Sequence, residues 1–239
     1  MIVRRRSVMP AMLALLGLAL HGVSQDAQAA TVRAANERAA VKVRSLQELR
    51  FADLVPQSWD VSCGAAALST LLTYHFSTPV SEYAIATWIL RGVDPRRVRA
   101  RGGFSLLDLK RFAQAIGFRA EGYGGMTLDD LRALNAPAIV PVRIHGLDHF
   151  VIVRGIVADR VVIGDPAFGN LTVSTARFER LWKGGIAFVV LADGAPAPDA
   201  SPLSPDVSDL RVPDLPNVAR MLRGAGPAPL TRTFAAVPK

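Results

Sequence analysis

The spacing of hydrophobic residues changes along the chain, from helical periods in the first half to short apolar runs in the second. After Cys63, Leu68, Leu71, Leu72 and His75 follow at i, i+3, i+4 and i+7, which predicts a helix over 63–75. Similar spacing predicts further helices over 81–90 and 105–116, and after Thr127. Strands are predicted over 138–144, 150–156, 160–163, 171–173 and 186–191. Helices first and strands later indicate an α+β fold.

Capping signals agree with these helices. Ser62 is a suitable N-cap for the first helix, and Ser105 with Asp108 has the spacing of a capping box. Gly117 is a natural C-terminal stop for the helix that Ser105 begins.

Cys63 is the chain's single cysteine, and it stands where a polar turn gives way to the first helix. Unpaired N–H groups and partial positive charge at a helix N-terminus favour a thiolate. Gly64 leaves room beside the sulfur for a substrate backbone, and Gln57 can aim its amide at an oxygen next to the thiol. The alternative is a buried structural cysteine.

Downstream, residues 148–156 and 160–165 have the pattern of a hairpin that turns near Asp159. His149 would begin the first strand and Asp165 would end the second, so antiparallel pairing brings them together. If the hairpin packs against the Cys63 helix, the three residues form a Cys–His–Asp relay. The alternatives are a simple turn at Asp165 and a solvent-facing histidine at the strand end.

Two other histidines have competing interpretations. His145 could join His149, Cys63 and Asp165 in a zinc site, but Gly146 interrupts the helix that would align the two histidines. His145 is also a substitute base if the hairpin register differs. His75 closes the first helix, where it serves as a dipole partner or core residue.

Together these segments resemble the C39-like cysteine peptidases, a family with a papain-like fold. The resemblance covers about 55–191 and rests on the order of its motifs: Gln57…Cys63-Gly64, Gly102-Gly103-Phe104-Ser105-Leu106, the strand from His149, Asp165-Pro166-Ala167-Phe168-Gly169 and Phe178…Trp182-Lys183-Gly184. It implies Cys63 as nucleophile, His149 as general base and Asp165 as orienting residue. It also implies an oxyanion hole formed by Gln57 and the Cys63 N–H, and requires no cofactor or metal.

The chain departs from family members that form the cytosolic end of a membrane exporter and trim double-glycine leaders. It contains no Gly-x-x-x-x-Gly-Lys-Ser/Thr phosphate loop and no membrane-spanning run after the first thirty residues. It looks more like the stand-alone, exported C39-like proteins found beside bacterial surface-fibre systems, including the C39-like component of functional-amyloid secretion.

The sequence divides into four parts. Arg4-Arg5-Arg6, an apolar run over 8–20 and the small-x-small site at 27–29 predict a signal peptide over 1–29 and a periplasmic mature protein. An uncleaved anchor is the alternative, although the run is shorter than the ~20 residues of a spanning helix. We expect a spacer or helix over 30–50, the peptidase domain over 51–193, and a Pro/Ala-rich disordered tail over 194–239, which holds nine of the sixteen prolines.

Removal of residues 1–29 would lower the formal charge from +8 to +6, and much of the remaining positive charge falls within some twenty residues, at Arg91, Arg96, Arg97, Arg99, Arg101, Lys110 and Arg111. The patch could meet an acidic substrate or a membrane surface, or it is a solvated helix face. Nucleic acid is not expected, because no aromatic residues alternate with these charges and the chain carries an export signal.

The combined prediction is an exported cysteine endopeptidase that acts on a partner protein, such as a fibre subunit or an outer-membrane secretion component. One alternative is a catalytically silent C39-like module that binds a peptide and guides it to a transporter. Another is an amidase or transglutaminase-like transferase on the same kind of site.

Overall fold

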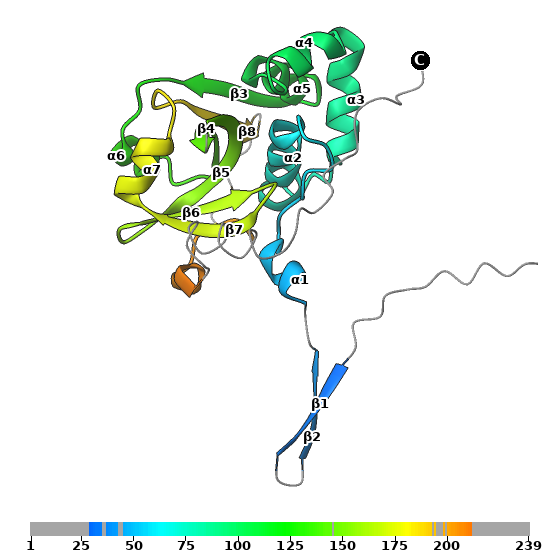
Figure 1. Cartoon of the computed structure of the whole chain (residues 1–239), viewed down its shortest axis with the longest axis vertical. Coiled ribbons are helices and arrows are strands. Elements are labelled where there is room, and N and C mark those ends of the chain that lie inside the picture. The colour runs from blue at the N-terminus through cyan, green and yellow to red at the C-terminus, as the bar shows by residue number, and fades with distance from the viewer. Residues whose placement is uncertain are drawn as a thin grey trace, which may run out of the picture. The chain divides into compact units, whose positions relative to one another are not determined.

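The computed structural model in Figure 1 describes residues 29–34, 37–42, 45–144, 146–192, 194, 198 and 200–211. The chain divides into two compact units, Met1–Arg44 and Ser45–Lys239. Residues 1–28 of the predicted signal peptide, His145, and 212–239 of the predicted tail lie outside the described residues.

The first unit contains a two-stranded antiparallel hairpin in its described part. Strand β1 (Ala29–Ala34) pairs with β2 (Glu37–Lys42), from Ala29 opposite Lys42 to Ala34 opposite Glu37. Of the spacer or helix expected over 30–50, helix is found only at α1 (Leu46–Arg50), which belongs to the second unit, and the role of a spacer stays a prediction. The β-branched residues Thr31, Val32 and Val41 favour the extended conformation.

The second unit begins with helices. They are α1, α2 (Cys63–Thr70), the π-helical turn η1 (Leu71–His75), α3 (Glu82–Gly92), α4 (Pro95–Ala100) and α5 (Leu106–Ala115). Later come α6 (Leu128–Ala133), α7 (Thr175–Leu181) and the 3-10 helix η2 (Val207–Arg211). No helix among the described residues combines the length and apolar character needed to span a bilayer.

A single antiparallel sheet organises the second unit. Its strands are β3 (Phe118–Tyr123), β4 (Ala138–Ile144), β5 (Leu147–Val157), β6 (Arg160–Asp165), β7 (Gly169–Ser174) and β8 (Ala187–Ala192). The described strands lie in the order β3-β8-β4-β5-β6-β7, and all their pairings are antiparallel. The predicted α+β fold, with helices packed on an antiparallel sheet, is confirmed.

Both faces of the sheet are covered. Ile139, Ile152 and Phe188 join the core formed with helices α2, α3 and α5, which lie together beside the sheet in Figure 1. Val140, Val151 and many neighbouring strand residues belong to a second core, which includes Leu131 of α6 and Phe178 of α7. Successive side chains of a strand point to opposite faces of the sheet, so each strand contributes residues to both cores.

Helix α2 is buried along its whole length because it lies between strand β5 and helices α3 and α5. Small residues allow this close approach. A Cβ added to Gly64 would lie 3.2 Å from both Leu109 Cδ1 and Phe150 Cδ2. The expectation that Gly64 leaves space for a substrate is therefore wrong, since core side chains occupy that space.

Three elements had too little hydrophobic signal to predict them. Strand β3 lies at the sheet edge, and its apolar alternation is limited to the half-buried Phe118 and the buried Ala120. Helix α4 buries only Val98 among its six residues and is nucleated by Asp94 as N-cap and Pro95 at the first helical position. Helix α7 buries only Phe178.

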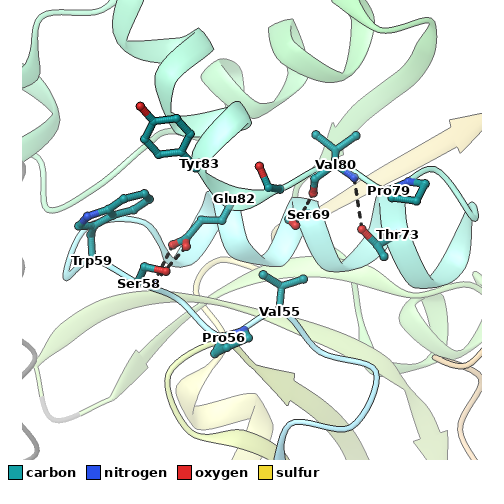
Figure 2. A pocket seen from close by; sticks show the side chains of 11 residues that line it. Val55, Pro56, Ser58, Trp59, Ser69, Thr73, Pro79, Val80, Glu82 and Tyr83 are labelled. Carbon is teal, nitrogen blue, oxygen red and sulfur yellow. Dashed lines mark hydrogen bonds between the residues drawn. The ribbon is translucent and has the colours of Figure 1, made fainter. Parts of the chain in front are cut away.

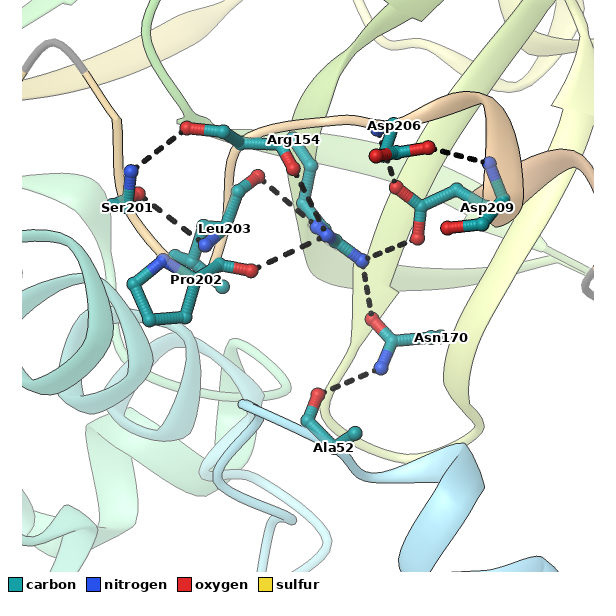
Figure 3. Close-up of polar contacts among 10 residues, drawn as sticks. Ala52, Arg154, Asn170, Ser201, Pro202, Leu203, Asp206 and Asp209 are labelled. Atoms are coloured by element: carbon teal, nitrogen blue, oxygen red, sulfur yellow. Dashed lines mark hydrogen bonds and ion pairs between the residues drawn. The ribbon is translucent and has the colours of Figure 1, made fainter.

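Residues 200–211, predicted to belong to a disordered tail, instead pack against the second unit. Leu203 is 1% exposed and joins the core that contains α2. Arg154 of β5 donates hydrogen bonds to the carbonyl oxygens of Leu203, Pro202 and Ser204, and it forms a 3.0 Å ion pair with Asp209 (Figure 3). A buried guanidinium requires such acceptors, and these residues supply them.

Candidate active site

Cys63 is the first residue of α2, as predicted, and is 5% exposed. Ser62 occupies the N-cap position but does not cap the helix with its side chain. Its hydroxyl oxygen instead lies within hydrogen-bond distance of the Glu82 carboxylate and 2.8 Å from the Trp59 carbonyl oxygen. The N–H groups of the first turn of α2 therefore remain without a Ser62 cap near the sulfur, and their partial positive charge favours an anion there.

The loop before Cys63 is fixed from α3 by a buried carboxylate. Glu82 is 4% exposed and accepts hydrogen bonds from the Ser58 N–H, at 2.9 and 3.1 Å, and from the Ser62 hydroxyl. Figure 2 shows Glu82 pointing from α3 toward Ser58, beside the rings of Trp59 and Tyr83. Glu82 thus holds both ends of the turn that delivers Cys63, a role that the sequence did not reveal.

His149 and Asp165 are brought together by the predicted hairpin. Ile152 of β5 pairs with Gly164 of β6, which places the start of one strand beside the end of the other. His149 Nε2 lies 2.8 Å from Asp165 Oδ1. The same oxygen accepts the N–H groups of Ala167 at 2.8 Å and Phe168 at 3.1 Å, so three donors fix a carboxylate that is 1% exposed.

The imidazole of His149 connects Asp165 to the thiol of Cys63. Burial alone would lower the pKa of His149, but the charge and hydrogen bond of Asp165, with the hydrogen bond and charge of Cys63, raise it to about 10. Because Nε2 faces Asp165, Nδ1 is the ring nitrogen left for the sulfur. The site therefore favours a protonated imidazole beside the Asp165 carboxylate.

Cys63 and His149 open into a cleft of about 440 Å³. One side is formed by residues 101–107, which follow α4, and the other by Asp148, Phe150 and Lys183. Gly103 has a φ of +151°, and a Cβ there would lie 3.0 Å from the Val61 carbonyl oxygen. The glycine allows the cleft wall to approach the loop that precedes the nucleophile.

Gln57 is tied to the Asp165 turn rather than aimed openly into this cleft. Its N–H donates to the Pro166 carbonyl at 2.9 Å, and its side-chain amide donates to the Trp59 carbonyl at 3.1 Å. The amide oxygen is buried and has no hydrogen-bond partner among the described residues. The structure thus unites Cys63, His149 and Asp165, while Gln57 does not line the cleft.

A second residue that the sequence did not reveal supports the Asp165 turn from α1. Arg50 Nη2 donates to the Phe168 carbonyl at 2.6 Å, and the Phe168 ring lies edge-on to His149 with 6.5 Å between ring centroids. Gly169 has a φ of +82°, and a Cβ there would lie 2.6 Å from the Arg50 carbonyl oxygen. The capping box of Ser45 and Glu48 is the local sequence signal for this helix.

The remaining histidine and metal interpretations do not alter the site. His75 is buried, and its Nδ1 lies 3.0 Å from the Ser201 hydroxyl, while burial lowers its pKa. His145 falls outside the described residues. Within the described part of the chain, no group of three or more His, Cys, Asp or Glu residues could hold a metal ion.

Comparisons with known proteins identify relatives of this arrangement. The model of the peptidase C39 family matches residues 52–193. The chain is 42% identical over 153 residues to a "probable functional amyloid protease FapD" of Pseudomonas aeruginosa, and 43% identical over 153 residues to a protein of the same name from Pseudomonas fluorescens. Each match covers 64% of this chain and 66% of the relative.

A solved structure shares the fold. The peptidase domain of Streptococcus ComA, a bifunctional ABC transporter involved in quorum sensing, is 27% identical with a TM-score of 0.50. The alignment covers 59% of this chain and 98% of that domain.

Proposed function

Because this chain belongs to the peptidase C39 family, we propose that it is a cysteine endopeptidase with Cys63 as nucleophile, His149 as acid and base, and Asp165 as the orienting carboxylate. The observation that carries the proposal is the continuous link from Asp165 Oδ1 through the His149 ring to Cys63, with the pKa of His149 raised to about 10. No cofactor or metal is required by this chemistry.

In the proposed reaction, the Cys63 thiolate attacks the carbonyl carbon of the scissile peptide bond. The resulting oxyanion accepts the Cys63 N–H. His149 then donates its Nδ1 proton to the leaving amine, which departs and leaves a thioester. Neutral His149 next takes a proton from water, and the hydroxide releases the acid and regenerates the thiolate.

Asp165 has two roles in these steps. Its hydrogen bond to Nε2 keeps the Nδ1 edge of the imidazole turned toward the sulfur, and its charge stabilises the imidazolium before the proton is given away. The Ala167 and Phe168 N–H groups hold the carboxylate in place while the histidine changes charge.

For the biological context, we propose that the chain is exported by residues 1–29 to the periplasm and cleaves a protein of a surface-fibre system. The support is the sequence pattern of the first 29 residues and the names of the two Pseudomonas relatives. A fibre subunit or an outer-membrane secretion component would be the substrate.

The first test compares alkylation of Cys63 by iodoacetamide from pH 5.5 to 9.5 in the mature protein and in His149→Ala. An ordinary thiol titrates near pH ~8.5, so its alkylation rate falls about 50-fold between pH 8.5 and 6.5. We expect the wild-type rate to change less than about tenfold over that interval, and the variant to show the ordinary fall. His75→Gln, which changes a histidine outside the cleft, is the matched control.

Turnover is tested separately by incubating the wild type and Cys63→Ala with proteins of a fibre-producing culture and identifying new N-termini by mass spectrometry. Cleavage by the wild type alone supports the peptidase. A wild-type thiol that responds to pH like His149→Ala would contradict the proposed ion pair, and the silent binding module would then become the preferred function.

A further inference from the structure

A hollow of about 310 Å³ lies between helices α3 and α5, outside the Cys63 cleft. It is lined by Trp88, Ile89, Arg91, Gly92, Val93, Asp108 and Arg111, and we call it the α3–α5 hollow. Trp88 is 37% exposed, and its ring rests edge-on against Phe112 with 5.5 Å between centroids. The hollow therefore offers an aromatic surface held in one orientation and accompanied by two guanidinium groups.

The cations around this hollow have no acidic partner among the described residues. Elsewhere in the second unit, Arg132 pairs with Asp129, and both Arg143 and Lys183 pair with Asp148. Within the described ranges, no ion pair or side-chain hydrogen bond is formed by the exposed arginines at Arg91, Arg96, Arg97, Arg99 and Arg111. These five guanidinium groups provide positive charge that the described part of the domain does not neutralise.

The two acids nearest in sequence are already engaged. Asp108 Oδ2 accepts Arg101 Nη2 at 2.5 Å together with the N–H and hydroxyl of Ser105. Asp94 accepts the Arg96 N–H at 2.8 Å as the cap of α4. An external carboxylate would therefore meet Arg91 and Arg111 with little competition from these side chains.

The hollow is a direct neighbour of the catalytic cleft. Asp108 lines the hollow, Arg101 lines the cleft, and the 2.5 Å ion pair between them forms the partition. The hollow and the cleft therefore adjoin at this ion pair. The two sites are thus placed to hold successive segments of one polypeptide.

We propose that the α3–α5 hollow is an exosite for the substrate, which binds an acidic segment that carries a large apolar side chain. The apolar side chain packs on Trp88, Ile89 and Val93, and flanking carboxylates bind Arg91 and Arg111. The inference rests on the proposed peptidase function, because it assigns the hollow to the same substrate. A recess between two helices accommodates one side chain, whereas a lipid surface would favour a flat or protruding apolar patch.

The experiment uses the mature protein with Cys63→Ala, so that binding is measured without turnover. The probe is a fluorescein-labelled peptide with one phenylalanine flanked on each side by three glutamates, and fluorescence anisotropy gives its Kd at 50 mM and 300 mM salt. A peptide with glutamine in place of glutamate is the control probe. Variants are Arg91→Gln with Arg111→Gln, Trp88→Leu, and the control pair Arg132→Gln with Arg180→Gln.

We expect the Arg91/Arg111 pair of substitutions to weaken binding of the acidic peptide about tenfold, since two exposed charge pairs each contribute a few-fold. Trp88→Leu should weaken it about fivefold, the control pair should remain within twofold, and the glutamine peptide should bind at least tenfold more weakly. High salt should reduce binding by the wild-type hollow most strongly.

The proposal is overturned if the acidic peptide fails to bind, or if the Arg91/Arg111 substitutions leave its Kd unchanged. It is also overturned if phosphatidylglycerol vesicles bind through these arginines while the peptide does not. These outcomes are independent of the alkylation test, because Cys63→Ala removes the thiol. Failure of the exosite and failure of the peptidase therefore give different results.

Discussion

Asp165→Asn separates the charge of the orienting carboxylate from its shape. Asparagine keeps an oxygen that can accept the Ala167 and Phe168 N–H groups, so the turn that follows β6 should persist. It removes the negative charge that lies 2.8 Å from His149 Nε2. The substitution therefore acts mainly on the protonation state of His149.

The size of the effect follows from the raised pKa of His149. A rise from 6.5 to about 10 corresponds to about 5 kcal/mol in favour of the imidazolium, at ~1.4 kcal/mol for each pKa unit. Burial opposes this rise, and the contributions of Asp165 precede those of Cys63 in size. Loss of the Asp165 charge should therefore remove the largest contribution that favours the imidazolium and lower the population of the ion pair.

The assay is the rate of Cys63 alkylation at pH 6.5, followed by peptide hydrolysis once a substrate is known. We expect Asp165→Asn to slow alkylation at least about tenfold while circular dichroism shows a retained fold. Asp129→Asn is the matched control, because Asp129 pairs with Arg132 and does not line the cleft. A loss of less than threefold in Asp165→Asn, or an equal loss in the control, would refute the assigned role of Asp165.

The contact between His149 and Asp165 makes the stability of the fold depend on pH. A pKa raised on folding contributes stability that is complete below about pH 6.5 and is lost as the pH rises to about 10. Urea unfolding at pH 6.5, 8 and 9.5 should show the wild type losing stability across this window, at no more than ~1.4 kcal/mol per pH unit from this group. Asp165→Asn should show a flatter profile, and equal slopes in both proteins would contradict the linkage.

Three further substitutions test the supports of the site. Glu82→Gln places an amide where two oxygens accept the Ser58 N–H, so alkylation at pH 6.5 should slow about tenfold with the fold retained, whereas Glu179→Gln on exposed α7 should have no effect. Arg50→Gln frees the Phe168 carbonyl and should slow alkylation about fivefold and shift its pH profile; Arg132→Gln is the control, and an unchanged profile would remove Arg50 from the positioning role. Arg154→Met leaves the carbonyl groups of 202–204 without their donor and should lower the free energy of unfolding by about 3 kcal/mol in urea titrations, against no change for the exposed Arg180→Met. An Arg154→Met protein as stable as the wild type would show that the 200–211 segment does not depend on this residue.

The sequence predicted the parts of the fold that have strong apolar periods or paired caps. Helices over 63–75 and 105–116 and the hairpin at 150–165 have these signals, and the structure contains them. Strand β3 was not predicted, because this edge strand has only Phe118 and Ala120 in apolar alternation and buries only Ala120 fully. The packing of the 200–211 segment was not predicted, because only Leu203 is buried there. The segment is held by Arg154, which is distant in sequence.

The sequence predicted the site residues that have local signals, but it did not predict those whose role depends on contacts distant in sequence. A unique cysteine at a helix start, and a histidine and an aspartate at meeting strand ends, can be read from local patterns. Glu82 could not be identified in this way, because Glu82 in the first turn of a helix looks like an ordinary helix-start acid until the fold places Ser58 against it. The orientation of Gln57 could not be predicted either. Its amide was expected to point beside the thiol, but the side chain is rotated so that it donates to the Trp59 carbonyl.

Residues that support the site and the core, Arg50 and the 200–211 segment, lie outside the residues that the family model matches. The family match ends at residues 52 and 193, yet one of these supports lies before it and the other after it. A recombinant fragment trimmed to the match would retain all three reacting residues but would lose the guanidinium that holds the Phe168 carbonyl. It would also expose the core surface that Leu203 covers and leave the buried Arg154 without its Asp209 partner. Swapping this catalytic unit into another protein therefore requires cuts near Ser45 and after Arg211.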